Sequence, residues 1–445
     1  MKKIFIKDLL SSKTLSENII ILGWIKNKRY HGSMLFWDVV DSTGEIQVLL
    51  NRNNIEEKIF NKIKGILPET AVKIIGDQRY FNNNGNENIE VVAKTVDVLG
   101  EYKLNIAPQP RSDFSIFEQK YTDHVLKNRS LYLRNPRQAA VLSFKSKFIF
   151  ELHKYFQENK YVLIEPPVMT EMLLYDDKTA FSFDYEGNTV WLSQCCTFQL
   201  EAAILAFEKV YSITPSFRSE HSRSDRHLNE YTHLKVEAAW ANMNDLLNLT
   251  EDILYNIVKR MAVVGEKELK FLNVKLNPDD YKPPFMKISY DEAVKILNKK
   301  EPFQYGKSMG KKRLSDLTKE FGNKHIWVEY PPRSAEGFPF SICPSNNNLV
   351  MAADLVAPYG FGEIGGVAEK IYSKEELLER MAEKGRTTPK DLERYKSYIE
   401  LREAGLPPHG GIGMGVDRIA RHLLKLPHVK DVLPYPRLFG RRWNP

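Results

Sequence analysis

The residues whose types and spacing could do chemistry gather in three separate segments of this 445-residue chain. The first, residues 217–231, is a loop dense in arginine and histidine between two apolar, strand-like runs. Arg218, Arg223 and Arg226 offer planar guanidinium groups that pair bidentately with phosphate oxygens, which suits a polyphosphate. Glu220, expected on the same strand face as Arg218, could accept a hydrogen bond from an exocyclic amine. Taken alone, the segment is also compatible with a surface hairpin whose charges are solvated.

The second segment, residues 410–420, is built around alternating glycines. Gly411, Gly413 and Gly415 are expected on one face of a strand, where the absence of side chains leaves a floor for a flat group. Arg418 follows at the start of a predicted helix. A glycine run near the C-terminus is not the fingerprint of a dinucleotide-binding fold, which carries its glycines in the first βαβ unit.

The third segment, residues 351–363, contributes two acids. Asp354 and Glu363 could hold a magnesium ion through their carboxylate oxygens. Because an isolated Asp–Glu pair is usually structural, this interpretation depends on the other two segments.

A β-domain is predicted at residues 1–103, ahead of the three segments. A helix is expected at residues 55–67, between the third and fourth strands. Five strands with a helix in that place are the pattern of an oligonucleotide-binding barrel, although strand count alone also allows a small β-domain that serves as a brace. The strands are expected at residues 19–24, 34–38, 45–50, 71–75 and 88–92.

A hinge and a larger domain follow the β-domain. Residues 104–135, which include Pro108 and Pro110, are interpreted as the hinge, and residues 136–445 as a domain that alternates helices and strands. Within it we expect an amphipathic helix at residues 144–157, a solvated lysine-rich insertion at 299–319 and charged surface helices at 370–404.

Composition limits the class of protein. Hydrophobic residues make up 42% and charged residues 27%, which excludes a disordered chain, a fibrous repeat and a disulfide scaffold. No apolar run approaches the roughly 18–20 residues needed to span a bilayer, and the N-terminus lacks the apolar core of a signal peptide. Three cysteines without a CxxC pair favour a reducing cytoplasm. The net charge of +7 permits RNA binding without requiring it.

In this order and spacing the three segments resemble the signature motifs of class II aminoacyl-tRNA synthetases. Residues 150–167 resemble the first motif, which builds a dimer interface, the arginine loop resembles the second, and residues 411–418 the third. The resemblance extends over nearly the whole chain and is closest to asparaginyl-tRNA synthetases. In the β-domain it is carried by residues that match the anticodon domain of the aspartyl/asparaginyl/lysyl subgroup, namely Gly23, Trp24, Arg29, Phe36, Asp38, Gln47 and Gly76.

The resemblance implies an α+β fold, in which an oligonucleotide-binding barrel precedes a catalytic domain built on an antiparallel sheet flanked by helices. It also implies a cytoplasmic homodimer that uses ATP and Mg²⁺ to activate an acid as an acyl-adenylate and transfers it to tRNA. Two alternatives remain open: a paralogue that adenylates a non-standard acid for tRNA or a small acceptor, and a non-catalytic tRNA-binding protein.

The resemblance also assigns roles in the nucleotide site. Arg218 would grip the α-phosphate and the reacting carboxylate, and Glu220 the adenine amino group. Adenine would lie between Tyr231 and Arg418, above Gly413 and Gly415. The outer phosphates would meet Arg226 and His227, and the magnesium ion would be held by Asp354 and Glu363. In the barrel, Phe36 would stack on an anticodon base, Gln47 would bond to its edge, and Arg29 would lie nearby, unless Phe36 belongs to the barrel core.

The expected acyl pocket departs from the family pattern. Thr197 replaces a glutamine that helps to hold the substrate ammonium, Lys235 replaces an acid, and Lys370 replaces the arginine that recognises the side chain. Leu200 occupies the position at which aspartyl enzymes carry a lysine. The other residues of the expected pocket are Ser193 and Glu237. A lysine near an ammonium replaces attraction with repulsion, so we expect free asparagine and aspartate to be poor substrates.

Overall fold

The computed structural model describes residues 3–12, 14–83, 86–106 and 115–443. The chain divides into two compact units, Met1–Gln109 and Pro110–Pro445. Pro108 and Pro110 of the expected hinge lie outside the described residues. Helices α3 (Thr122–Lys127) and α4 (Arg129–Tyr132) lie within the stretch interpreted as hinge and belong to the second unit.

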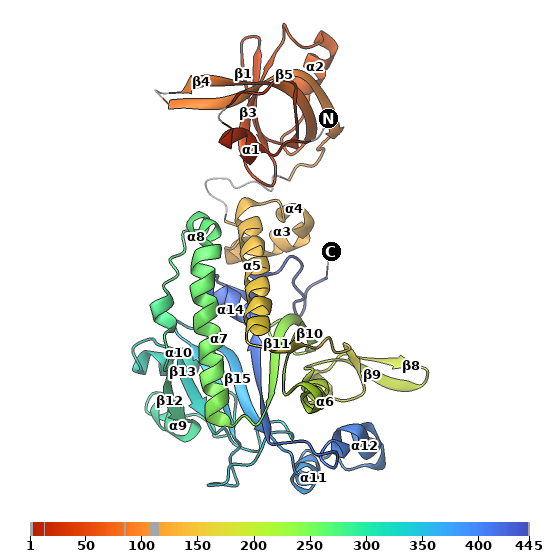
Figure 1. Cartoon of the computed structure of the whole chain (residues 1–445), viewed down its shortest axis with the longest axis vertical. Coiled ribbons are helices and arrows are strands. Elements are labelled where there is room, and N and C mark those ends of the chain that lie inside the picture. The colour runs from red at the N-terminus through yellow and green to blue at the C-terminus, as the bar shows by residue number, and fades with distance from the viewer. Residues whose placement is uncertain (1–2, 13, 84–85, 107–114, 444–445) are drawn as a thin grey trace. The chain divides into compact units, whose positions relative to one another are not determined.

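The first unit is a closed five-stranded barrel with strand order β1-β2-β3-β5-β4 (Figure 1). As predicted, a helix, α2 (Glu57–Gly65), lies between the third and fourth strands, and a short helix, α1 (Ile6–Ser11), precedes the barrel. Alternate residues of β2 and β3, such as Trp37 and Val48, fill the interior. The strands are β1 (Ile19–His31), β2 (Met34–Val40), β3 (Glu45–Asn51), β4 (Ala71–Asn83) and β5 (Asn86–Gly100).

The second unit is built on a mainly antiparallel sheet, in which, among the described strands, only the outer pairs β12–β13 and β10–β6 are parallel. In the described part of the chain its strand order is β12-β13-β14-β15-β16-β11-β10-β6. These strands are β6 (Val162–Leu163), β10 (Lys209–Phe217), β11 (Glu230–Ala239), β12 (Met286–Ser289), β13 (Ile326–Glu329), β14 (Ala352–Ala357), β15 (Gly362–Lys370) and β16 (His409–Gly415). A smaller sheet contains β7 (Met169–Thr170), β9 (Asn188–Leu192) and β8 (Ser182–Tyr185).

Helices cover this sheet, and the two longest, α5 (Pro136–Glu158) and α7 (Met243–Val264), lie side by side (Figure 1). The expected helix at 144–157 is the C-terminal part of α5, which begins earlier because Asn135 caps it and Pro136 occupies its first turn. The others are α6 (Thr197–Phe207), α8 (Glu266–Leu272), α9 (Tyr290–Asn298), α10 (Lys311–Glu320), α11 (Lys374–Glu383), α12 (Pro389–Arg394), α13 (Lys396–Glu400) and α14 (Val416–Leu423). No helix in the described ranges is long and apolar enough to cross a membrane.

The lysine-rich stretch at residues 299–319 differs from its prediction as a solvated insertion. Its second half belongs to α10, whose Leu314 and Leu317 are buried with Val328 and Val356. The lysines lie on the opposite, exposed face of an amphipathic helix, so the segment is part of the domain.

Candidate active site

The three motif segments meet in one cleft above the central strands of the sheet. A cavity of about 370 Å³ brings together most of the residues predicted for the nucleotide site. Its lining includes Arg218, Glu220, Arg226, His227, Tyr231, Glu363, Gly413, Gly415 and Arg418. A second cavity of about 260 Å³ is lined by Asp354 and shares the lining residue Glu363 with the first, so the two are adjacent.

The arginines of this cleft present donors that nothing in the described structure satisfies. Arg218 Nε and Arg226 Nη1 are buried and have no hydrogen-bond partner there. The Arg218 guanidinium lies 4.9 Å from the ring of Tyr175 and 5.9 Å from that of Tyr231, and its Nη1 is 3.4 Å from Glu220. Because unsatisfied buried donors are costly, these groups suit an anionic ligand such as a polyphosphate.

The glycine strand β16 forms the floor that the sequence predicts. A Cβ atom at Gly413 would lie 3.1 Å from Lys235 Nζ, and one at Gly415 would lie 3.3 Å from the side chain of Arg418. At Gly411 it would lie 2.2 Å from Glu237 Oε1, so this glycine makes room for the carboxylate of Glu237 and lies outside the nucleotide cavity.

His227 is a neutral hydrogen-bonding group. Its Nδ1 lies 2.8 Å from the hydroxyl of Ser222 and 2.6 Å from that of Ser224. Partial burial and the nearby charge of Arg418 lower the pKa of His227 to about 4. If the hydroxyls donate to Nδ1, the proton sits on Nε2, which can then donate to a ligand oxygen.

The two acids of the cleft differ in their affinity for protons. Desolvation in the cleft and the neighbouring charges of Glu363 and Glu336 raise the pKa of Asp354 well above its ordinary value. Glu363 itself accepts a hydrogen bond of 3.2 Å from Arg418, and Arg418 and Arg226 outweigh desolvation and lower its pKa. Carboxylates held together in this way suit a cation. Within the described ranges, however, no group of three or more His, Cys, Asp or Glu side chains could hold a metal ion.

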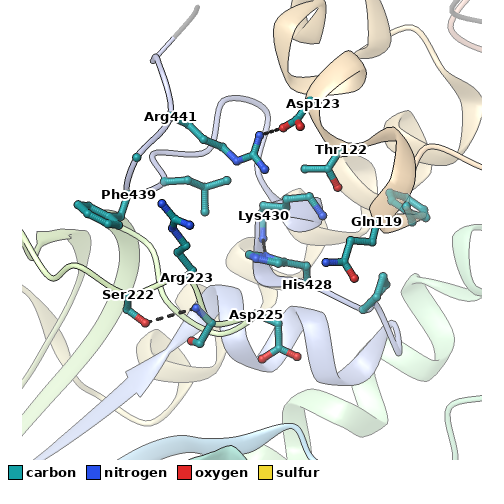
Figure 2. Close-up of a pocket in the computed structure, with 15 residues that line it drawn as sticks. Gln119, Thr122, Asp123, Ser222, Arg223, Asp225, His428, Lys430, Phe439 and Arg441 are labelled. Carbon is teal, nitrogen blue, oxygen red and sulfur yellow. Dashed lines mark hydrogen bonds and ion pairs between the residues drawn. The ribbon is translucent and has the colours of Figure 1, made fainter.

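Arg223, the third arginine of the loop, does not join the nucleotide cavity. It lines a separate cavity of about 730 Å³ with His428, Lys430 and Arg441, and Figure 2 shows these side chains around it. The prediction that all three arginines share one site is therefore wrong for Arg223, whereas Arg218 and Arg226 line the same cavity.

The residues predicted for the acyl pocket separate into two groups. Thr197 at the start of α6 donates a hydrogen bond of 2.7 Å to Glu237, and Lys235 and Lys370 lie within electrostatic range of the same carboxylate. Ser193 and Leu200 belong instead to the surrounding core. The hydroxyl of Ser193 donates to the carbonyl of Cys195 at 3.0 Å, and Leu200 is fully buried among apolar side chains.

Two site residues, Glu336 and Arg386, escaped the sequence analysis because no motif carries them. Tyr175, Glu336 and Arg386 line a cavity of about 800 Å³ that shares Arg218 and Glu220 with the nucleotide cavity. Arg386 donates to the carbonyl of Tyr175 at 2.5 Å and thereby holds this residue beside Arg218. Their sequence separation leaves no local signal that could have identified them.

The residues predicted to read an anticodon lie together on the barrel surface. Phe36 is half-buried on the outer face of β2, whereas its neighbours Leu35 and Trp37 point into the core, which excludes the alternative that Phe36 is core. Arg29 donates to Gln47 Oε1 at 3.0 Å, and Gln47 Nε2 donates to Glu90 at 2.6 Å. The network fixes the orientation of the Gln47 amide.

Comparisons with known proteins agree with this architecture. Residues 122–438 match the family of tRNA synthetases class II (D, K and N), and residues 19–99 match the OB-fold nucleic acid binding domain. The chain is 31% identical to the asparagine–tRNA ligase of Thermoplasma acidophilum, over 98% of this chain and 99% of that protein. It is 32% identical to the ligase of Pyrococcus furiosus, over 96% of each.

The fold is also that of solved synthetases. The crystal structure of asparaginyl-tRNA synthetase from Pyrococcus horikoshii complexed with asparaginyl-adenylate superposes with a TM-score of 0.87 and 30% identity, and covers 100% of both chains. The asparaginyl-tRNA synthetase of Entamoeba histolytica complexed with asparaginyl-adenylate superposes with a TM-score of 0.83 and 27% identity over 99% of both chains. The predicted α+β fold and family resemblance are confirmed, and the chain belongs to the class II tRNA synthetases of the D, K and N group.

Proposed function

We propose that this protein activates a carboxylic acid with ATP as an acyl-adenylate and transfers the acyl group to tRNA. The observation that carries the proposal is the nucleotide cavity, where the unsatisfied donors of Arg218 and Arg226 stand above the floor of Gly413 and Gly415. The relatives that match over nearly the whole chain are asparagine–tRNA ligases, so activation of asparagine is the starting hypothesis.

The reaction requires positioning and charge neutralisation but no protein nucleophile. The substrate carboxylate attacks the α-phosphorus of ATP, and pyrophosphate leaves. In the proposed arrangement Arg218 neutralises both the reacting carboxylate and the α-phosphate, and Arg226 and neutral His227 bind the outer phosphates. Tyr231 and Arg418 hold the adenine ring between them, and Glu220 accepts a hydrogen bond from its amino group.

Magnesium would be bound by Asp354 and Glu363. The two residues come from the adjacent strands β14 and β15, and burial together with the nearby charges of Glu363 and Glu336 raises the pKa of Asp354. When bound, the ion would offset this charge and that of the ATP phosphates.

The partner proposals rest on two surfaces. On the barrel, Phe36, Gln47 and Arg29 would bind the anticodon of a cytoplasmic tRNA by stacking and hydrogen bonding. On the catalytic unit, the homodimer interface would form on α5 and the edge strand β6. There Phe150 is 67% exposed, and the two-residue strand Val162–Leu163 leaves apolar side chains in solvent.

The test removes one arginine and keeps its neighbour as a control. Arg418→Ala should weaken ATP binding and abolish ATP–pyrophosphate exchange with any acid, because the side chain lines the cavity and contacts Glu363. Arg223→Ala removes an arginine that lines the separate cavity and should leave ATP binding unchanged. Undiminished exchange in Arg418→Ala would refute the assignment.

A further inference from the structure

The cavity of about 730 Å³ that Arg223 lines is a second place at which the arginine loop can meet a ligand. Its walls come from residues 222–225 of the loop, the start of α3, the segment around His428 and residues 438–441 near the C-terminus (Figure 2). Ser222 and Ser224 line this cavity, and their hydroxyls lie 2.8 and 2.6 Å from Nδ1 of His227, which lines the nucleotide cavity. Consecutive residues of one loop therefore serve two neighbouring cavities.

The charged groups of this cavity leave a positive excess. Burial and the charge of Lys430 lower the pKa of His428 to about 4, so this histidine is neutral at pH 7. Among the described residues, the charged side chains that line the cavity or form ion pairs with its lining are five cations and three acids, namely Arg223, Lys311, Arg421, Lys430 and Arg441 and Asp123, Asp225 and Asp431. The cavity therefore suits an anion.

Arg223 is the lining cation to which the described structure gives no acidic partner. Its side chain is exposed, and no hydrogen bond or ion pair joins it to another described residue. Arg441 pairs with Asp123, but the side chain of this acid is 82% exposed, so the pair is weak. Both guanidinium groups can therefore exchange solvent or a weak partner for the oxygens of a phosphate, which they bind bidentately.

The same cavity also offers an acceptor. Oδ2 of Asp225 accepts a hydrogen bond of 2.7 Å from Arg421, whereas its Oδ1 is buried and has no partner within the described ranges. A phosphate group offers mainly acceptors, but a ribose carries hydroxyl groups that can donate to such a carboxylate. Phe117 and Phe439 add apolar surface to the lining. Cations, an acceptor and aromatic rings together match a nucleotide better than a bare phosphate ion.

We propose that this cavity binds a ribonucleoside 5′-monophosphate, which is either the 5′-terminal nucleotide of a tRNA or a free nucleotide. Its phosphate pairs with Arg223 and Arg441, and a ribose hydroxyl donates to Asp225. A terminal phosphate monoester carries a charge of about −2 at pH 7 and so offsets the positive excess more fully than an internal phosphodiester, which carries one charge.

The tRNA source rests on the proposed transfer to tRNA, whereas the free-nucleotide source does not. In a tRNA the 5′-terminal nucleotide is paired beside the strand whose 3′ end must reach the nucleotide cavity. The arginine loop lines both cavities, so it can contact both ends of one acceptor stem. RNA ends present groups that a protein can recognise without reading a duplex.

The experiment measures what the 5′-phosphate adds to each source. The full chain is titrated in a filter-binding assay with one tRNA that carries either a 5′-monophosphate or a 5′-hydroxyl, at a fixed salt concentration. A separate calorimetric titration compares uridine 5′-monophosphate with uridine, because neither carries the adenine expected in the nucleotide cavity. We expect the phosphate to strengthen binding of at least one of these ligands about tenfold.

Variants locate this effect in the cavity. Arg223→Ala and Arg441→Ala should each remove most of the phosphate's contribution, and Arg223→Lys should retain part of it, because the charge remains without the planar fork. Lys299→Ala, at an exposed lysine that lines none of the cavities described above, is the control and should keep the full effect. Since Arg223 and Arg441 are exposed, the ligand-free variants should have the Tm of the unmodified protein, which distinguishes a lost contact from a misfolded chain.

The proposal is overturned if the 5′-phosphate changes the affinity of neither ligand, or if Arg223→Ala and Arg441→Ala leave its effect unaltered. An effect that is lost in these variants supports the proposal, and it assigns the site to tRNA or to a free nucleotide according to which ligand shows it. Failure of both tRNA forms to bind would contradict the proposed acceptor instead, and the uridine titration would still test the cavity.

Discussion

Replacing Arg402 should lower the free energy of unfolding, because Arg402 pairs with a buried carboxylate beneath the expected acyl pocket. Its guanidinium donates to Glu201 at 2.8 Å, to the carbonyl of Ile371 at 2.7 Å and to the carbonyl of Tyr398 at 2.9 Å, and neither charged side chain of the pair is exposed. Arg402→Met would leave Glu201 charged and buried in a site where its Oε1 already has no partner. Breaking one side of a buried pair costs about 3–5 kcal/mol.

The pKa of Glu201 indicates a similar free energy for this buried ion pair. Although burial opposes ionisation, Arg402 and His409 lower this pKa from 4.5 to about 2. A carboxyl group whose pKa is lower in the folded state contributes stability that is present above pH 4.5 and is lost as the pH falls towards 2. The difference corresponds to roughly 3 kcal/mol at pH 7.

The assay is urea denaturation of the full chain at pH 7 and pH 5. Arg402→Met should lose about 3–5 kcal/mol of unfolding free energy at pH 7. The loss should be smaller at pH 5, because in the variant the pKa of Glu201 lies above its unfolded value and protonation then favours the folded state. Adding Glu201→Gln to the variant should recover part of the loss. A loss below about 1 kcal/mol at pH 7, or a double variant no more stable than the single one, would refute the reasoning.

Three further predictions concern the barrel, the pocket floor and a buried histidine pair. Phe36→Ala should weaken tRNA binding by about 1–3 kcal/mol in a filter-binding assay, and equal binding would exclude base stacking. Gly411→Ala should raise the KM for the acid but not for ATP in pyrophosphate exchange, because its Cβ would lie 2.2 Å from Glu237; an altered KM for ATP alone would contradict this placement. His325 and His422 lie 3.1 Å apart, and burial lowers the pKa of His325 to about 3 and that of His422 well below 6.5, so stability should fall as the pH drops below 6.5. For His325 this loss is about 3 kcal/mol by pH 4, and His422→Asn should make the total loss smaller when unfolding is measured against pH.

Local patterns in the sequence predicted the parts of the fold and site that depend on local geometry. The alternation of residues along β16 places Gly411, Gly413 and Gly415 on one face, since side chains of a strand alternate between its two sides. The five strands and helix of the barrel, and the arginine loop between β10 and β11, follow from similar short-range signals. Periodicity also explains α10: the lysine count suggested a solvated insertion, but the spacing of Leu314 and Leu317 gives the helix a buried face.

Tertiary structure decided which of these residues meet and what charges surround them. Arg223 and Arg226 are three residues apart in one loop yet line different cavities, because the path of the loop directs their side chains apart. Tyr175 and Arg386 meet although 211 residues separate them. Lys235, Glu237 and Lys370 are brought together only by the register of β11, β15 and β16. The free energy of a buried charge depends on every group within a few ångströms, and the sequence by itself does not determine which groups those are.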